Sequence, residues 1–266
     1  MPITAQTTFG DTRIGIDIGG TGIKAGIVDP YSGQLVGSRL HIPTPHPSTP
    51  TAITEAISLL VDELSRQASP PPATSPVGVA FPGIIRYGIV RSSANLDEGW
   101  LGEDIVRLLA QRLDRPVDVI NDADAAGLAE VRHGAAAGLL GTVLVITLGT
   151  GIGSALLFRG DLIPNAELGH LEIDGRSAES RTSAVARERH GLSWAEYARR
   201  LQRYLSQLEF LFSPDLLVIG GGISARADEY LPSLRLRTPV VPAVLRNDAG
   251  IIGAGSHVAT TPDLHK

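Results

Sequence analysis

The sequence predicts an α/β protein of two domains built on a duplicated core, and two observations carry this prediction. First, the segment Gly20–Ile23 (GTGI) recurs 129 residues later as Gly149–Ile152, each time between two apolar segments of strand character. Second, predicted strands and helices alternate along the rest of the chain, as in layered α/β proteins. We expect the two glycine turns to face each other across a cleft. In a chain with 30 glycines, chance recurrence is the alternative.

The first half is predicted to open with an antiparallel meander, because alternating apolar residues are separated by short turns. Its three strands are expected at Arg13–Asp17, Lys24–Val28 and Gln34–Ile42. Helices and strands then alternate, with predicted bounds Thr51–Gln67 (helix), Val77–Phe81 (strand), Leu101–Leu113 (helix), Val117–Ile120 (strand) and Ala123–His133 (helix).

The second half repeats the strand–turn–strand opening. Its elements are expected at Thr142–Leu148 (strand), Ile152–Phe158 (strand), Gly160–Gly191 (mostly loop), Trp194–Leu211 (helix), Leu216–Ile219 (strand), Val240–Leu245 (strand) and Gly250 to about Ala259 (helix). We therefore expect a smaller N-terminal domain over residues 1–120 and a larger domain over 121–248. A C-terminal helical segment, about 249–266, is expected to return to the first domain.

Composition narrows the function classes. The chain has 266 residues, of which 43% are hydrophobic and 19% charged, so a packed globular protein is expected. The net charge of −5 gives nucleic-acid binding no global electrostatic support. No signal peptide and no apolar stretch long enough to span a membrane is visible, and there is no cysteine, so a cytoplasmic protein is expected.

The two glycine turns are candidate phosphate sites. Glycine lets the backbone approach a phosphate closely, and successive N–H groups form an anion nest. Asp17 precedes the first turn and has no counterpart in the second, where position 146 is Ile. We interpret Asp17 as a Mg²⁺ anchor acting through water, the alternative being a carboxylate that accepts turn amides. Lys24 is a candidate charge partner for a phosphoryl donor, or a solvated strand residue.

Three further polar or glycine-rich segments leave alternatives open. Asn121–Asp124 lies where a strand ends and a helix begins, which suits either a general base or an N-cap. Glu167 and His170 are candidate ligands for a metal or a sugar hydroxyl, or surface residues. Gly220–Gly222 follows a predicted strand and would let a flat base or a phosphate approach, or simply open a helix.

Together these segments resemble the ROK family of sugar kinases, which has the actin-like (ribonuclease H-like) fold. Asp17–Lys24 looks like the family's first phosphate motif, Leu148–Gly153 like the second, and Val218–Ile223 like the adenosine-side motif. Asn121 resembles the sugar-binding asparagine and Asp122 the catalytic aspartate. The resemblance runs in order from about residue 14 to 255.

Within the family, Asn121–Gly127, Asn165–Ile173 and Ser193–Trp194 are most similar to actinobacterial polyphosphate glucokinases, including the polyphosphate/ATP glucomannokinases. This resemblance implies transfer of a phosphoryl group from polyphosphate or ATP to the 6-hydroxyl of glucose, with mannose as a second candidate acceptor. An ATP-only ROK hexokinase for another sugar and a non-catalytic sugar-binding protein are the alternatives. A homodimer is compatible with the resemblance, and neither nucleic acid nor a membrane is implied as a partner.

The resemblance implies a role for each matching position. Asp122 is the expected general base, and Asp17 the expected Mg²⁺ anchor. The implied sugar contacts are Gly83, Asn95, Asn121, Asp122, Glu167, His170 and Glu179. The implied phosphate and nucleotide contacts are Gly19, Gly20, Thr21, Gly22, Lys24, Gly149, Thr150, Gly151, Gly220, Gly221 and Gly222.

Two departures from the family pattern refine these expectations. The cysteine run that follows the histidine in zinc-holding relatives is absent, so no zinc is expected and His170 is assigned to the sugar. The loop from His170 to Glu179 is short, and the resemblance matches Glu179 to the family's second sugar-binding glutamate. Only 16 residues precede Asp17, too few for the helix-turn-helix domain of ROK repressors.

Overall fold

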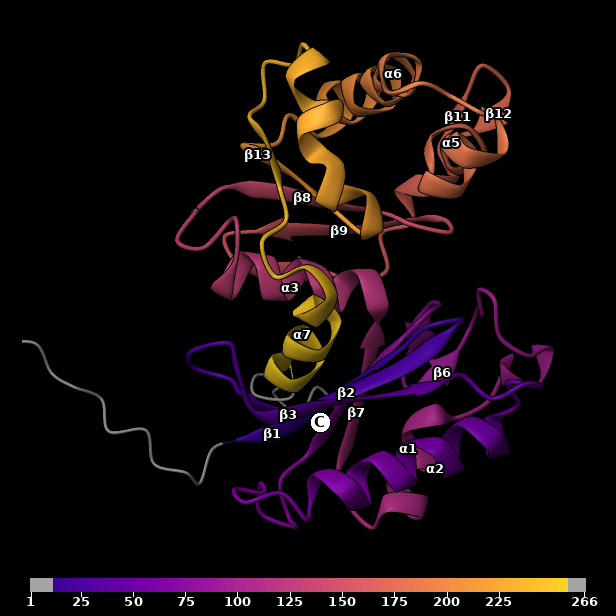
Figure 1. Ribbon diagram of the computed structural model, residues 1–266, viewed down its shortest axis with the longest axis vertical. Coiled ribbons are helices and arrows are strands. Elements are labelled where there is room, and N and C mark those ends of the chain that lie inside the picture. Colours follow the sequence, from indigo (N-terminus) through magenta and orange to yellow (C-terminus); the bar gives the residue numbers. More distant parts are fainter. Residues whose placement is uncertain (1–11, 258–266) are drawn as a thin grey trace, which may run out of the picture. The chain divides into compact units, whose positions relative to one another are not determined.

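The computed structural model describes residues 12–257, which form two compact units (Figure 1). The first unit runs to Asn121 and includes the C-terminal segment from Gly250, and the second runs from Asp122 to Ala249. Each unit contains one five-stranded sheet with helices on both faces. None of the helices within residues 12–257 is long and apolar enough to cross a membrane.

The sheet of the first unit has the order β3-β2-β1-β4-β7. β1, β2 and β3 are antiparallel neighbours, whereas β4 and β7 run parallel to β1. The strands are β1 (Arg13–Ile18), β2 (Gly22–Asp29), β3 (Gln34–Pro43), β4 (Val77–Phe81) and β7 (Val117–Asn121). A separate hairpin pairs β5 (Ile85–Arg86) with β6 (Ile89–Val90).

The sheet of the second unit has the matching order β10-β9-β8-β13-β14. β8, β9 and β10 are antiparallel neighbours, and β13 and β14 run parallel to β8. The strands are β8 (Thr142–Leu148), β9 (Ile152–Phe158), β10 (Asp161–Ile163), β13 (Leu216–Gly220) and β14 (Val240–Pro242). Because both order and strand direction repeat, the prediction of an α/β protein with a duplicated core is confirmed.

In the first unit, alternate residues of β1 face opposite sides of the sheet, as the two-residue period of a strand requires. Ile14 and Ile16 are fully buried in a core that also contains residues of α1 (Pro50–Leu64) and α2 (Ile105–Leu113). Gly15, between them, packs on the backbone of α7 (Ala249–His257), which covers the other face (Figure 1).

The second unit is built in the same way. Leu144 and Ile146 of β8 are buried with the apolar face of α6 (Trp194–Phe212). α3 (Asp122–His133) lies on the other face, where Gly127 packs on Ala155 of β9 (Figure 1). A Cβ atom built on Gly127 would lie 2.3 Å from the Ala155 Cβ, so glycine is needed for this close approach.

Several predicted boundaries were wrong. The segment 160–191 contains more structure than a loop, namely β10, β11 (Glu172–Ile173), β12 (Arg176–Ser177), α4 (Ala178–Thr182), α5 (Ala184–Arg189) and a 3-10 turn at Leu168–His170. The helix predicted from Leu101 begins at Ile105, because the Asp104 side chain accepts the backbone N–H of Arg107 and caps it there. The strand predicted from Val240 ends at Pro242, and the segment predicted beyond His257 lies outside the described residues.

The remaining described elements are short 3-10 helices. They are Glu98–Trp100, Gly222–Glu229, Leu231–Ser233 and Arg246–Asp248.

Candidate active site

The candidate residues of the first unit gather at the carboxyl ends of its parallel strands. β1 and β4 are paired with Asp17 opposite Ala80, and β4 and β7 with Phe81 opposite Asn121. Asp17 and Asn121 therefore lie near the same edge of the sheet. Open α/β sheets bind their ligands at this edge.

The first glycine turn is short and tightly held. The N–H of Gly19 donates to the carbonyl of Gly22 at 3.0 Å, and the hydroxyl of Thr44 donates to the carbonyl of Gly19. Asn95 lies against this turn, since a Cβ atom built on Gly20 would be 3.2 Å from the Asn95 Cβ. The structure thus brings a predicted sugar contact beside a predicted phosphate turn.

Asp17 has two positive neighbours inside the first unit. Its Oδ2 lies 3.3 Å from Nζ of Lys24, which faces it across the β1–β2 pair. Its carboxylate also packs on Gly250, where a Cβ atom would lie 2.7 Å from the Asp17 Cγ. Gly250 is in the first turn of α7, and a helix N-terminus attracts negative charge. These two neighbours stabilise the carboxylate beside the glycine turn.

Asn121 and Gly83 are joined by a hydrogen bond. The buried side-chain amide of Asn121 donates to the carbonyl oxygen of Gly83 at 3.1 Å. Gly83 in turn packs on Ser92, whose carbonyl oxygen would lie 2.1 Å from a Cβ atom at position 83. Asn121 therefore holds the loop that follows β4 in place.

The second glycine turn, in the second unit, is held by a carboxylate. The N–H of Gly149 donates to the carbonyl of Gly151 at 3.0 Å, one residue closer in sequence than the bonded pair of the first turn. Oε2 of Glu179, at the start of α4, accepts the N–H of Ile152 at 2.9 Å. The predicted sugar contact Glu179 thus braces the second glycine turn, a position that sequence reasoning did not assign to it.

The third glycine segment adjoins the second. β13 pairs in parallel with β8, with Gly220 opposite Thr147, so both strands end at the same edge of the sheet. Gly221 has a φ of 77°, and a Cβ atom there would lie 2.4 Å from the Leu148 carbonyl oxygen. Only glycine suits this conformation and this contact. Gly222 begins the 3-10 helix that follows.

The start of α3 carries two carboxylates with different surroundings. Asp122, its first residue, is half-buried, whereas Asp124 is fully buried. Oδ2 of Asp124 accepts the N–H of Asn165 at 2.7 Å. Burial raises the pKa of Asp124 to about 7; the Asn165 N–H opposes this shift, and the charges of Glu167 and Asp122 add to it.

Glu167 and His170 lie on the loop that Asp124 anchors. The Glu167 Oε2 is 3.9 Å from Nε2 of His170. Burial raises the pKa of Glu167, His170 lowers it, and the charge of Glu179 raises it. Ser154 of β9 holds the same loop, because its hydroxyl accepts the N–H of Leu168 at 2.9 Å and donates to the Ala166 carbonyl.

Sequence reasoning assigned no role to Ser154 or to Asp124. The Asn121–Asp124 segment was singled out as polar, so the sequence did draw attention to Asp124. Its contact with Asn165 was not predictable, because the two residues are 41 positions apart along the chain. Ser154 carried no signal. Within residues 12–257, no three His, Asp or Glu side chains are grouped as a metal site.

Replacing Asp124 with asparagine is expected to flatten the pH dependence of stability. A carboxyl whose pKa is higher in the folded chain favours folding while protonated, and this contribution is lost as the pH rises from about 4 to about 7. Asparagine keeps an oxygen for the Asn165 N–H and carries no charge. We therefore expect the variant to be more stable relative to the wild type at pH 8 than at pH 5.

The measurement is the urea midpoint at the two pH values, followed by fluorescence of Trp194, the tryptophan of the second unit, in a Trp100→Phe background. The difference in urea midpoint between variant and wild type is compared at the two pH values. This difference removes the effect of the other titrating groups, which are the same in both proteins. An equal difference at both pH values would contradict a buried, raised-pKa carboxyl at position 124.

Two sheets of identical order, each with a glycine turn joining its first two strands, define a duplicated protein of the actin-like ATPase fold. The chain belongs to the ROK family, whose family model matches residues 13–190. Three similar proteins extend the likeness over nearly the whole chain.

The polyphosphate glucokinase of Mycobacterium tuberculosis (strain ATCC 25618 / H37Rv) is 44% identical over 257 residues, which cover 95% of this chain and 94% of the relative. The crystal structure of the inorganic polyphosphate/ATP-glucomannokinase from Arthrobacter sp. strain KM has 66% identity and a TM-score of 0.90, covering 94% of this chain and 99% of that one. The crystal structure of a ROK family glucokinase from Streptomyces griseus, in complex with glucose and AMPPNP, has 27% identity and a TM-score of 0.79. The match covers 92% of this chain and 98% of that one.

Proposed function

We propose that this chain transfers a phosphoryl group from inorganic polyphosphate or ATP to the 6-hydroxyl of glucose, with mannose as a second acceptor. The similarity to a polyphosphate glucokinase and to a polyphosphate/ATP-glucomannokinase over almost the full chain supports this activity. The structural observation that carries it is the position of Asn121 and Asp122, at the carboxyl end of β7 and the start of α3.

In the proposed mechanism, Asp122 accepts the proton of the sugar 6-hydroxyl as the hydroxyl oxygen attacks the terminal phosphorus of the donor. The bond from that phosphorus to its bridging oxygen breaks, and ADP or the shortened polyphosphate leaves. Asp122 is half-buried at a helix N-terminus, where the helix dipole stabilises a carboxylate. Such transfers depend mainly on positioning and electrostatics, with the base orienting the attacking oxygen. Asp124 would act only on structure, because it is fully buried.

Besides Asp122, the sugar would be bound by the six residues that the family resemblance assigns to it. They are Gly83, Asn95, Asn121, Glu167, His170 and Glu179. The loop that carries Glu167 is held by hydrogen bonds to Asp124 of α3 and to Ser154 of β9, which suits a residue that must hold a hydroxyl in one orientation. The side chain of His170 is 71% exposed, so it is accessible to a sugar.

The donor phosphates would be bound by the backbone of the glycine segments. These are Gly19, Gly20, Thr21 and Gly22, then Gly149, Thr150 and Gly151, and for the adenosine side of ATP Gly220, Gly221 and Gly222. The internal hydrogen bonds of the first two turns hold them in shape before the donor arrives. The same proposal treats the two compact units as the two domains of the kinase.

Asp17 fits a Mg²⁺ ion held through water. Mg²⁺ keeps several waters and uses one or two carboxylates together with substrate phosphates, so a single partly exposed carboxylate beside a glycine turn suits it. When bound, the ion would neutralise charge on the phosphoryl oxygens. The Asp17 side chain would orient it, with Lys24 as the neighbouring fixed positive charge.

Replacing Lys24 with alanine is expected to raise KM by about 10- to 150-fold for both donors, since a charged hydrogen bond to phosphate is worth about 1.5–3 kcal/mol. The KM for glucose should stay the same. Steady-state kinetics with ATP and with polyphosphate measure both values. Lys24→Arg, which keeps the charge, serves as the control. Unchanged donor KM values in the alanine variant would leave Lys24 only its ion pair with Asp17.

The activity itself is tested with the purified protein. Glucose, mannose, fructose and N-acetylglucosamine are each supplied with ATP and with polyphosphate in the presence of Mg²⁺, and phosphorylated sugar is measured. Turnover of glucose with both donors is expected. Turnover of another sugar with ATP alone would replace the proposed substrates. No turnover in any combination, with sugar binding retained, would favour the non-catalytic alternative.

A further inference from the structure

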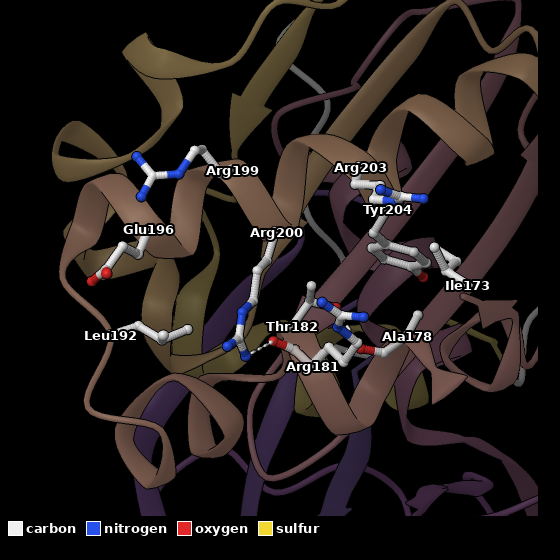
Figure 2. Close-up of a pocket in the computed structure, with 10 residues that line it drawn as sticks. All are labelled: Ile173, Ala178, Arg181, Thr182, Leu192, Glu196, Arg199, Arg200, Arg203 and Tyr204. Atoms are coloured by element: carbon white, nitrogen blue, oxygen red, sulfur yellow. Dashed lines mark hydrogen bonds between the residues drawn. The ribbon is translucent and has the colours of Figure 1, made fainter. Parts of the chain in front are cut away.

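The second unit contains a pocket outside the candidate active site, between α6 and the short helix α4 (Figure 2). Its volume is about 270 Å³. Four arginines line it, Arg181 from α4 and Arg199, Arg200 and Arg203 from α6. Figure 2 shows the Arg200 side chain extending from α6 to the backbone of Arg181, where its Nη1 donates to the carbonyl oxygen at 3.4 Å. The pocket thus presents guanidinium groups from two elements.

The carboxylates near these arginines are fewer and are already engaged. Glu196 also lines the pocket, but its Oε2 accepts both the N–H and the hydroxyl of Ser193 and completes the cap of α6. Asp174 beside the pocket pairs with Arg203 at 2.5 Å and lies 3.8 Å from Arg181. Four guanidinium groups therefore face two carboxylates, in a chain whose net charge is −5. The positive surplus is local to this pocket.

The rest of the lining is mainly apolar. Leu192 and Ile173 contribute aliphatic surface, and Tyr204 of α6 is almost fully buried at the same place (Figure 2). A volume of about 270 Å³ lies close to the lower end of the range for small-molecule sites. Guanidinium groups bind phosphate oxygens through paired hydrogen bonds. The volume of the pocket and its arginine side chains therefore suit a small phosphorylated anion.

We propose that this pocket binds a small phosphorylated compound as an effector, separately from the kinase substrates. The arginines would bind a cluster of phosphoryl oxygens. Two kinds of compound carry such a cluster: an organic phosphate of about the size of a hexose phosphate, and a short inorganic phosphate chain. The apolar part of the lining favours the organic source.

The position of α4 provides the link to the candidate active site. This helix has only five residues, and Glu179 and Arg181 lie two positions apart, so their side chains point to opposite sides of it. Glu179 braces the second glycine turn through the N–H of Ile152, while Arg181 lines the pocket. An anion bound to Arg181 therefore acts on the helix that supports the turn.

The test measures binding without turnover, so it is independent of the kinase activity. Binding of glucose 6-phosphate and of inorganic tripolyphosphate is measured by calorimetry for the wild type and for Arg199→Gln/Arg203→Gln. Two binding events per chain are expected in the wild type, one in this pocket and one in the proposed active site. One of them should weaken at least tenfold in the double variant. Arg107→Gln, an arginine of α2 in the first unit, is the matched control and should leave both events unchanged.

The compound whose binding to this pocket is weakened in the double variant shows which kind of phosphate the pocket binds. Loss with glucose 6-phosphate indicates an organic phosphate, and loss with tripolyphosphate indicates an inorganic chain. If the double variant folds, as shown by an unchanged circular dichroism spectrum, and binds both compounds like the wild type, the proposal is overturned. Glucose phosphorylation without effector should be the same in the double variant and in the wild type.

Discussion

Replacing Asp122 with asparagine is expected to lower kcat for glucose phosphorylation by about 10²–10⁴-fold, the usual contribution of a positioned base. Asparagine has nearly the same shape but cannot accept the proton of the sugar hydroxyl. The KM values for glucose and donor should change little, because the hydrogen-bonding shape of the side chain is kept. Steady-state kinetics with ATP and with polyphosphate test this for both donors.

Asp118→Asn is the matched control, because it makes the same chemical change four residues earlier, in β7, the strand that leads into α3. Asp118 pairs with His257 of α7 at 3.3 Å and has no proposed contact with substrate. We expect this variant to keep a normal kcat. If Asp122→Asn also kept a near-normal kcat while folded, the remaining interpretation of Asp122 would be an N-cap of α3.

Replacing Gly78 with alanine is expected to destabilise the first unit by at least about 3 kcal/mol, at the upper end of the cost of overpacking. A Cβ atom at position 78 would lie 2.0 Å from the carbonyl oxygen of Ala254 and 2.5 Å from its carbonyl carbon. These are backbone atoms of α7, so relief requires the whole helix to move away from β4. Urea denaturation followed by fluorescence of Trp100, in a Trp194→Phe background, reports on the first unit alone.

Gly26→Ala provides the comparison under the same helix. A Cβ atom there would lie 3.2 Å from Leu35 Cδ2 and 3.5 Å from Ile251 Cγ2, which are side-chain ends that can shift. We expect a clearly smaller loss of stability than for Gly78→Ala. Equal losses for the two variants would show that α7 does not pack as closely on β4 as the structure describes.

Much of the fold was predictable because its signals are local. The strands on either side of each glycine turn have the two-residue period of a half-buried sheet, and the predicted bounds of β8 and β9 match the structure. The two α-helices that sequence reasoning missed, α4 and α5, have five and six residues. Such short segments show less than two turns of helical period, and α4 is held from outside, as when the Tyr197 hydroxyl donates to the Thr182 carbonyl at 2.8 Å.

The sequence predicted which residues lie at the ends of strands near the candidate site. It did not predict which of these residues contact one another. The motifs placed Asp17, Asn121 and Asp122 at strand ends, and the structure has them there. No motif indicated that Glu179 would brace the second glycine turn, or that Asp124 would hold Asn165. These contacts join segments that are 27 and 41 residues apart, which no local period records.

The sequence by itself determined the duplicated α/β core, the ROK family resemblance and the places of the glycine turns, because each depends on a short run of residues whose order is visible. Only the tertiary structure decided which charges meet. Asp17 lies beside Lys24 and the first turn of α7, Asp124 is buried with a pKa near 7, and four arginines share one pocket with few carboxylates. Burial and electrostatic pairing depend on distance in space, so they appear only once the chain has brought remote segments together.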